Sequence, residues 1–360
     1  AGVQAAIQLQ KSKKFDVTLI SDRKFLYVFP ISIWIPVHKT QPNDVQVPLE
    51  NIRKRYPFNL VIDKVNQIVA AENNVICDQN TFSYDYLIIA FGAEKLPIQG
   101  IENTLSICGK PEMAVEIRNR LDELVKKGSG NIALGFGGNP KDKSAVRGGP
   151  GFELAFNIHN YLKKKGLRNN FELTFFAPMD EPGARMGKQA LSMMDSMFSD
   201  YKIFKHFGKK IKVFEKNAVV FEDDSRLNSD LILFIPGLAG HSALKSSDLP
   251  LNDAGFVKIN DHCQVPNFSN VFAIGDIAAI EGAEWIAKQG HIAELMGTNA
   301  AFNIMKIEKG STKRKGYQAH LNIICVMDTG NGAAFVFRNG TKAFVIPLPV
   351  VGHWMKKAWG

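Results

Sequence analysis

Stretches with helical spacing of apolar residues alternate with short, continuous apolar runs through the middle of the chain. Helices are predicted over Pro111–Lys127, which Gly128 ends, and over Gly151–Lys165. The apolar runs predict strands over Asn131–Phe136, Phe171–Phe176, Val219–Phe221 and Leu231–Ile235. This alternation indicates a doubly wound α/β domain with a mainly parallel sheet.

A second pattern of this kind opens the chain. Apolar residues lie at helical spacing over Ala1–Leu9, and Asp16–Asp22 is predicted as a short strand that ends in a carboxylate. This order is the second half of a βαβ unit, whose first strand lies at the centre of a dinucleotide-binding sheet and leads into a G-x-G-x-x-G turn. Because a sheet without that strand exposes unpaired backbone, we expect roughly a dozen further residues before Ala1. Gly2 is then the last glycine of the turn, and Asp22 has the spacing of the acid that binds an adenosine ribose.

Two Rossmann-like units and a smaller C-terminal region account for the whole pattern. The strands predicted over Phe256–Ile259 and Val271–Ile274 return the chain to the first unit. We predict an FAD-type dinucleotide domain over residues 1–103 and 239–309, a second one over 104–238, and a C-terminal region over 310–360. The longest apolar run, Phe25–Val37, contains two prolines and is expected in a loop or at a sheet edge.

Composition restricts the kinds of partner that the chain is expected to bind. The 360 residues carry 44 Lys and Arg against 35 Asp and Glu, a net charge of +9. No nucleic-acid-binding module is recognisable, so the charge indicates either an ordinary soluble basic protein or, as the more specific interpretation, attraction to an anionic lipid surface. The four cysteines, Cys77, Cys108, Cys263 and Cys325, are widely spaced, which predicts neither a disulfide framework nor a metal site and fits a reducing, cytoplasmic setting.

Two segments carry the clearest ligand-binding pattern. An apolar strand within Tyr84–Ala93 ends in the small residues Ala90 and Gly92, and glycine lets a ligand approach the backbone closely. A second strand within Ser269–Asp276 ends in Gly275 and Asp276, which places a carboxylate at the C-terminal end of the strand, where ligands bind in such sheets.

In this order, the two segments resemble the FAD site of the flavoproteins with two dinucleotide-binding domains. The resemblance implies that Ala90, Gly92, Gly275 and Asp276 contact FAD, together with Gly2, Asp22 and Pro30. Phe91 departs from the family pattern, in which a small polar residue is usual at this position.

Within those flavoproteins the chain resembles the sulfide:quinone oxidoreductases, a family related to the type II NADH dehydrogenases. Ser144–Glu153 is similar to their middle-domain signature, and Trp285–His291 is similar to the segment beside the flavin and the quinone pocket. The resemblance implies that Lys288 lies at the flavin, where a cation stabilises the anionic reduced form. The alternative for Lys288 is an ordinary solvated charge.

The cysteines match the family only in part. Cys108 and Cys325 resemble two of the cysteines that act on sulfide, whereas Arg147 or Gly148 occupies the place of the third. A thiolate at Cys325 remains a candidate nucleophile, and Arg147 would lower its pKa if the two lie close together. The alternative is that Cys108 and Cys325 are small buried residues, as we expect for Cys77 and Cys263.

The middle domain is where a nicotinamide cofactor would bind if NADH were the electron donor. A long polar insertion, Asn139–Arg147, separates the glycine-rich turn Gly135–Gly138 from the following helix, and this disfavours a compact pyrophosphate cradle and hence NADH as the reductant. Glu153 is interpreted as a charge favoured by the helix dipole or, second, as a proton relay near the flavin.

The C-terminal segment Val350–Trp359 has the pattern of an amphipathic helix. Trp354 lies with other apolar residues on one stripe, while Lys356 and Lys357 are predicted on the opposite, polar side. This composition suits a lipid headgroup region, although a terminal helix packed on its own domain is the alternative.

These features predict an FAD-dependent oxidoreductase that passes two electrons from a small reductant, with sulfide as the first choice, to a membrane quinone. The enzyme is expected on the cytoplasmic face of a membrane as a peripheral protein, and a homo-oligomer is left open. The alternatives are an NAD(P)H:quinone reductase and a non-catalytic flavin-binding or sulfur-sensing relative.

Overall fold

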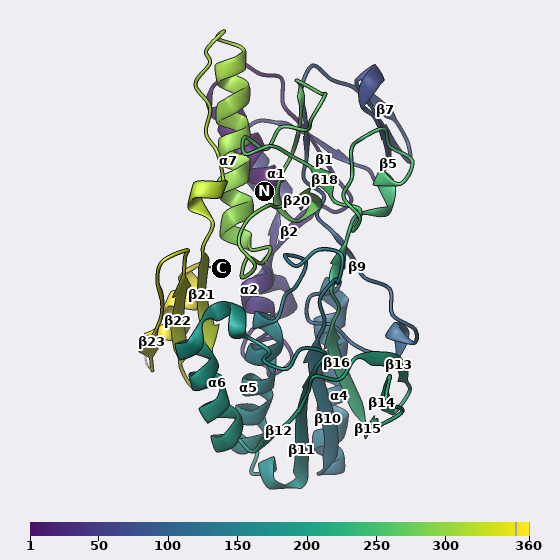
Figure 1. Cartoon of the computed structure of the whole chain (residues 1–360), viewed down its shortest axis with the longest axis vertical. Coiled ribbons are helices and arrows are strands. Elements are labelled where there is room, and N and C mark those ends of the chain that lie inside the picture. Colours follow the sequence, from purple (N-terminus) through teal and green to yellow (C-terminus); the bar gives the residue numbers. More distant parts are fainter. Residues whose placement is uncertain (350, 360) are drawn as a thin grey trace.

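The computed structural model describes residues 1–349 and 351–359, and side chains up to Lys357 with the exception of Val350. It has an α/β architecture in which the first and middle units lie end to end and a small antiparallel sheet stands beside them (Figure 1). Most predicted elements are confirmed, and the helix predicted over Pro111–Lys127 has those bounds.

The first unit is built from short parallel strand pairs and two long neighbouring helices. β1 (Thr18–Ser21) pairs with β4 (Asn59–Ile62), β8 (Leu87–Ile89) with β19 (Val271–Ala273), and β18 (Val257–Lys258) with β20 (Ala278–Ala279). Helices α1 (Gly2–Lys11) and α7 (Gly290–Ile307) pack against each other and share a core with β8 and β19. Within the described residues no strand joins the β1–β4 pair to the β8–β19 pair. The further strand expected before Ala1 stays a prediction.

Smaller elements complete this unit and its border. They are the antiparallel sheet of β5 (Val65–Val69), β6 (Asn74–Cys77) and β7 (Thr81–Ser83), the hairpin-like pair of β2 (Phe25–Tyr27) and β3 (Gln46–Pro48), and the helices α2 (Phe29–Ser32) and α3 (Leu49–Arg55). β9 (Glu94–Lys95) pairs with β17 (Leu238–Ala239) where the chain passes between the first and middle units.

The middle unit contains a four-stranded parallel sheet. Its order is β12 (Ile203–Phe207), β11 (Phe171–Ala177), β10 (Gly130–Phe136) and β16 (Leu231–Ile235). Helices α4 (Pro111–Lys127), α5 (Gly149–Lys164) and α6 (Lys188–Asp200) cover one face. The other face packs on an antiparallel sheet of β13 (Ile211–Glu215), β14 (Ala218–Phe221) and β15 (Arg226–Asn228). The doubly wound prediction is therefore wrong in this detail, because helices cover only one face here.

The alternation of side chains along β11 explains why different elements cover the two faces of the sheet. Successive side chains of a strand point to opposite faces, so Phe175 and Phe176 enter separate cores. Phe175 stacks on Phe152 of α5 with ring centroids 4.8 Å apart, whereas Phe176 stacks on Phe234 of β16 at 5.6 Å.

The apolar run Phe25–Val37 lies at a sheet edge and in turns, as predicted, with one helical turn between them: it comprises β2 of a two-stranded sheet, α2 and the turns after it, but it is more buried than a surface loop. Ile33 and Ile35 are completely buried and belong to the core of the middle unit. Pro30 is accommodated because it lies in the first turn of α2, where a missing N–H leaves no helical hydrogen bond unmade.

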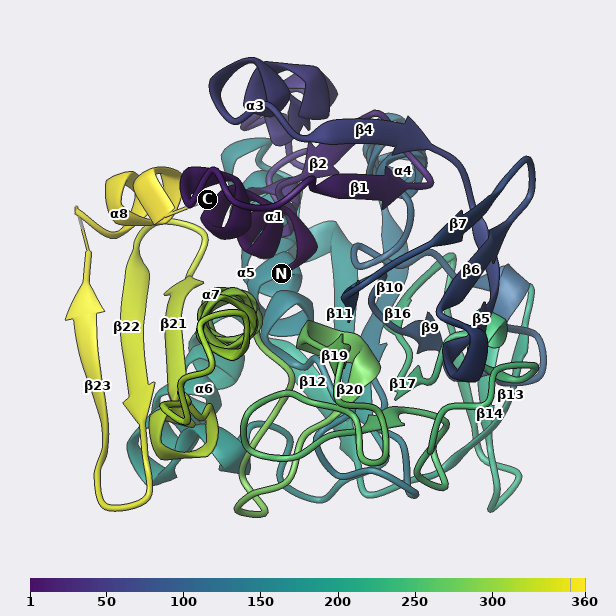
Figure 2. The same cartoon turned by 90° about the horizontal axis from the view of Figure 1, so that it is seen from above.

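The C-terminal region is a three-stranded antiparallel meander followed by a helix (Figure 2). Its elements are β21 (Ile323–Asp328), β22 (Ala333–Arg338), β23 (Ala343–Leu348) and α8 (Gly352–Trp359). α8 contacts β21, β22 and α2, and β21 also contacts α5. Among the helices of the described residues, none is both long and apolar enough to cross a bilayer.

Candidate active site

The two strand ends predicted to bind a ligand lie side by side. β8 and β19 are parallel, and their register pairs Ile89 with Ala273, so the turns after both strands emerge at the same end of the sheet. Gly92 has φ 81°, and a Cβ atom there would meet nothing within 4 Å, which leaves its backbone open to a ligand.

The N-termini of α1 and α7 come to this same place. A Cβ on Gly2 would lie 3.0 Å from the Cβ of Ala90, and a Cβ on Gly275 would lie 3.1 Å from Ala1 and 3.3 Å from Ala293. Neither helix has a side-chain cap at its N-terminus. Two helix ends with free N–H groups beside open backbone form a suitable site for a phosphate-containing ligand.

The other predicted contact residues lie at more exposed positions. Asp22 follows β1 and pairs with Arg23, whose Nε lies 3.0 Å from Asp22 Oδ1 at the surface. Pro30 is exposed on α2. Their part in the site stays a prediction.

Arg147 connects Asp276 to one of the two candidate thiols. Its guanidinium forms an ion pair with Asp276 and also lies against Cys108. Burial raises the pKa of the Cys108 thiol, and the charge of Arg147, the charge of Lys95 and a hydrogen bond from Arg147 oppose that rise without cancelling it, so the net shift is upward here as well. Arg147 thus acts on Cys108, and it does not contribute to the pKa of Cys325 as the sequence had suggested.

Cys325 has a different environment. Burial and, second, the Glu153 carboxylate raise the pKa of Cys325 to about 12, which Lys356 only partly offsets. The thiol is therefore protonated at neutral pH, and the expectation of a thiolate at Cys325 is not supported. Glu153 also acts on Cys108, so this carboxylate lies within electrostatic reach of both thiols.

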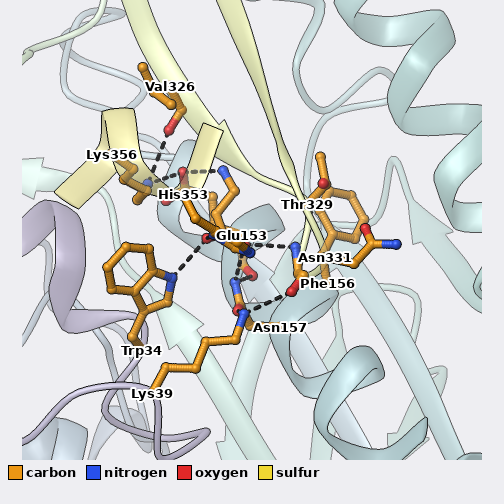
Figure 3. Close-up of polar contacts among 12 residues, drawn as sticks. Trp34, Lys39, Glu153, Phe156, Asn157, Val326, Thr329, Asn331, His353 and Lys356 are labelled. Atoms are coloured by element: carbon orange, nitrogen blue, oxygen red, sulfur yellow. Dashed lines mark hydrogen bonds and ion pairs between the residues drawn. The ribbon is translucent and has the colours of Figure 1, made fainter. Parts of the chain in front are cut away.

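Glu153 forms a buried ion pair with Lys356 at the centre of Figure 3. Both side chains are only 5% exposed. Asp328 N donates to Glu153 Oε1 at 2.9 Å, and Lys356 Nζ also donates to the Val326 carbonyl at 3.1 Å. Two interpretations are corrected: Glu153 is not a helix-end charge, since it lies in the second turn of α5, and Lys356 does not face solvent.

The pair remains charged because each group stabilises the other. Burial raises the pKa of Glu153, and Lys356 lowers it without cancelling the rise. Burial lowers the pKa of Lys356, but the charges of Glu153, Cys325 and Asp328 and the hydrogen bond to Glu153 together outweigh it, so the net shift is upward. An ion pair with a carboxyl pKa above its usual range can accept a proton more easily than a surface carboxylate.

Asp328 is a residue that the sequence analysis missed, and it joins four separate segments of the chain. Trp34 Nε1 and Asn157 Nδ2 donate to its carboxylate at 2.8 and 2.9 Å, and Gly330 N donates at 2.6 Å. His353 Nδ1 of α8 lies 2.9 Å from Asp328 Oδ2. The only sign of this role in the sequence was a charged residue at the end of an apolar strand. Many surface strands end in the same way, so the pattern does not single out Asp328.

Lys39 extends the same network. Its Nζ donates to Asn157 Oδ1 and to the Gly330 carbonyl, both at 2.7 Å. The loop after α2, helix α5 and the β21–β22 turn are thereby held together.

Lys288 lies just before α7 and is buried, so the solvated-charge alternative is wrong. Its Nζ donates to the Ala278 carbonyl and lies 4.0 Å from the centroid of the Phe256 ring. Burial lowers the pKa of Lys288 to about 7, with a smaller opposing contribution from Asp142 and a further lowering by Arg147.

The polar insertion before α5 is fixed to both neighbouring units. Leu238 N donates to the Ala145 carbonyl at 3.1 Å, Asn139 Nδ2 donates to the Leu238 carbonyl at 2.8 Å, and Lys288 N donates to the Ser144 carbonyl at 3.0 Å. The glycine-rich turn and the N-terminus of α5 are therefore separated by an anchored loop, as the insertion predicted.

With this geometry described, comparison with known proteins decides the family. The model of the pyridine nucleotide-disulphide oxidoreductase family matches residues 1–300. The chain belongs to this family.

Two curated relatives of this oxidoreductase are named for different electron donors. The sulfide-quinone reductase of Aquifex aeolicus is 27% identical over 349 residues, which cover 89% of this chain and 77% of that protein. The type II NADH:quinone oxidoreductase of Staphylococcus aureus is 24% identical over 367 aligned positions, 94% of this chain and 87% of that protein.

Solved structures show the same fold. The sulfide:quinone oxidoreductase from Aquifex aeolicus superposes with a TM-score of 0.86 at 24% identity and covers 99% of this chain and 87% of its own. NDH2 from Plasmodium falciparum has a TM-score of 0.75 at 15% identity and covers 99% and 91%.

The oxidoreductase thus brings together some predicted site residues and separates others. Ala90, Gly92, Gly275 and Asp276 meet at one end of the sheet, and Arg147 links that end to Cys108. Cys325 is affected by the charges of Glu153 and Lys356 and not by that of Arg147. Among the described residues, no three His, Cys, Asp or Glu side chains are grouped to hold a metal ion.

The ion pair predicts a double-mutant pattern in the free energy of unfolding. Lys356→Met leaves the Glu153 carboxylate buried without a cation, and we expect a loss of about 3–5 kcal/mol. The double variant Glu153→Leu and Lys356→Met removes both charges and should recover most of that loss. Urea unfolding of the two single variants and the double variant measures this, and strictly additive losses would contradict a coupled pair.

Lys288 predicts a pH dependence of stability. Its pKa is about 7 in the folded protein and 10.5 when unfolded, so between these values the unfolded chain binds more protons. Stability should therefore rise with pH in this window, by roughly 3 kcal/mol between pH 7 and 9.5 from this group alone. Lys288→Met should remove that part of the rise. Parallel slopes for wild type and variant in urea unfolding across the window would show that Lys288 titrates normally.

Proposed function

We propose that this oxidoreductase uses FAD to pass two electrons from a small reductant to a membrane quinone, with sulfide as the first candidate for the reductant. The observation that carries the proposal is the buried Glu153–Lys356 pair, which joins a proton-accepting group in the middle unit to the helix α8. Quinone reduction needs two protons with its two electrons, and such a pair beside an apolar helix suits that need.

The chain's own residues fit FAD. Gly92 offers open backbone, Gly2 lets α1 approach β8, and the uncapped ends of α1 and α7 would bind the pyrophosphate. Asp276, whose carboxylate is paired with Arg147, would bind the ribityl or pyrophosphate region of FAD. Bound FAD supplies two-electron redox chemistry, and Lys288 would contribute a positive charge in its protonated form.

Glu153 and Lys356 would handle the protons. Glu153 Oε1 accepts from both Lys356 Nζ and Asp328 N, so the Lys356 ammonium could pass one of its protons directly to the carboxylate and be reprotonated afterwards. Burial raises the pKa of the Glu153 carboxyl group above its usual range, which favours proton uptake.

Helix α8 would hold the enzyme on the cytoplasmic face of a membrane. Trp354 is 73% exposed and Val351 56% exposed, while Lys357 also points to solvent. Val350 and the side chains of Ala358 and Trp359, which complete the predicted apolar stripe, lie outside the described residues. An exposed tryptophan beside lysine, on a chain of net charge +9, suits an anionic headgroup region.

An NAD(P)H:quinone reductase is the second candidate. The type II NADH:quinone oxidoreductase relative favours it. The anchored loop between Asn139 and Gly148 disfavours it, because the glycine turn and the start of α5 do not form one compact phosphate cradle. A flavin-binding protein without rapid turnover is the outcome if neither donor is used.

The donor is tested by anaerobic stopped-flow reduction of the flavin. We expect sulfide to reduce it within seconds and NADH to reduce it at least 100-fold more slowly. Cys108→Ser should slow sulfide reduction by roughly 100-fold or more, since a hydroxyl is a far poorer nucleophile than a thiolate. Cys263→Ser, at a buried thiol outside the site, is the matched control and should react as wild type does. Faster reduction by NADH than by sulfide would support the second candidate.

The membrane role is tested with point variants of α8, because deletion of the helix would also remove Lys356. Trp354→Asp with Val351→Ser should reduce binding to vesicles of 30% phosphatidylserine by roughly tenfold through lost apolar contact and charge repulsion. Phe204→Asp, at another exposed aromatic far along the chain, is the matched control. Equal sedimentation of all three proteins with vesicles would exclude α8 as the membrane contact.

A further inference from the structure

The exposed apolar side chains of the described residues gather in one region of the surface. Six of the eight large ones lie on β2, α2, β3 or at α8, with exposed fractions between 36% and 73%. These six are Leu26, Phe29, Val47, Val351, Trp354 and Met355. Single exposed apolar residues are ordinary on a protein surface, whereas a group of this size indicates a contact surface.

Direct contacts connect the members of this group. Leu26 of β2 and Val47 of β3 lie opposite each other in the antiparallel pair, so their side chains share one face. The chain continues from β2 into α2, where the Phe29 ring packs edge-on against Tyr27 with centroids 4.7 Å apart. α2 in turn contacts α8, and β2 and α8 lie toward the same upper side of Figure 2. We call Leu26, Phe29 and Val47 the β2–β3 patch.

The strand pattern explains why the β2–β3 patch faces outward. Successive residues of β2 point to opposite faces, so Tyr27 enters the core at 6% exposure and Leu26 points away from it at 42% exposure. Where one face of an antiparallel sheet meets water, its outward positions are normally polar. Apolar residues at both outward positions of the Leu26–Val47 pair therefore indicate that something other than water covers this face.

The charges around the patch favour an anionic lipid surface. Lys24 directly precedes β2, and Lys54 and Arg55 end α3, a helix that contacts both β2 and β3. All three side chains are exposed. Within the described part of the chain, none of the three forms an ion pair with a carboxylate. An apolar surface bordered by free cations is complementary to the acyl chains and anionic headgroups of a bilayer.

A second copy of this chain fits the patch less well. In a twofold contact the same surface meets itself, so the cations beside the patch would face one another. Pro48 at the end of β3 has no N–H to donate, which also hinders the pairing of a further strand along β3.

We propose that the β2–β3 patch is a second membrane contact, which enters the headgroup region of an anionic bilayer beside α8. Two contacts from opposite parts of the sequence fix how the protein is oriented on the bilayer, which a single short helix does not. The inference rests on the proposed function in one respect only, since it extends the membrane side proposed for α8, and it needs neither sulfide nor quinone.

A fluorescent probe within the patch tests the proposal directly. Val47→Cys in the full-length, flavin-bound protein is labelled with an environment-sensitive dye and mixed with vesicles of 30% phosphatidylserine. The emission should move to shorter wavelength, and lipids with a nitroxide on the acyl chain should quench it at least twofold, because an interfacial apolar face reaches the acyl boundary. Phe204→Cys, at an exposed position on β12, is the matched control and should show neither effect. Wild-type protein treated with the same dye measures the background from the native cysteines.

Point variants measure what the patch contributes to binding. Leu26→Ser with Val47→Ser should weaken vesicle binding by roughly tenfold through lost apolar contact. Lys54→Gln with Arg55→Gln should weaken it severalfold at low salt and much less at high salt, where surface charges are screened. Lys126→Gln with Lys127→Gln, at the end of α4, removes two exposed charges elsewhere and is the control. Thermal melting identifies any variant that fails to fold, and the labelled Val47→Cys protein gives an independent measurement.

Two results would overturn the proposal: a Val47 probe that stays in water while the protein is bound to vesicles, or unchanged vesicle binding of the Leu26 and Val47 double variant. A shift of the Val47 emission that appears without lipid and grows with protein concentration would also overturn it, because a second copy would then cover the patch. Failure of the proposed function is a separate outcome. Unchanged binding of the Trp354 and Val351 variant would exclude α8, and slow reduction by sulfide would exclude the donor, while the Val47 probe would still report the patch.

Discussion

The buried contact between Glu153 and Lys356 is the constraint on which the middle and C-terminal parts of this protein depend. Two charges removed from water lose several kcal/mol of hydration each, and they are tolerated only when each satisfies the other and further hydrogen bonds complete both. Here Asp328 N and the Val326 carbonyl supply those bonds. Helix α8 must dock in one orientation for Lys356 to reach Glu153, so the position of the tail is fixed by electrostatics as well as by packing.

That orientation has a consequence for the exposed face of α8. With Lys356 directed inward and His353 beside Asp328, Trp354 is left in solvent. An amphipathic helix normally buries its apolar stripe in the protein, but this helix uses a lysine for docking and keeps a tryptophan free. One short helix therefore provides both the buried lysine that docks it and an exposed apolar surface.

The two candidate thiols are distinguished by charge and not by depth. Glu153 raises the pKa of both, while Arg147 and Lys95 oppose that effect only at Cys108. The same arginine also neutralises Asp276, so the predicted cofactor carboxylate and the thiol share one cation.

The sequence by itself determined the α/β class, most helices and strands, and the two strand ends that carry Gly92 and Asp276. These follow from local spacing: apolar periodicity and glycine positions act within a few residues and need no distant partner. The burial of Lys288 and Lys356, the hub at Asp328 and the contact of Arg147 with Cys108 were decided only by tertiary structure. Each joins residues more than 30 positions apart or depends on what covers a side chain, and a lysine in a polar pattern looks the same whether water or a carboxylate faces it.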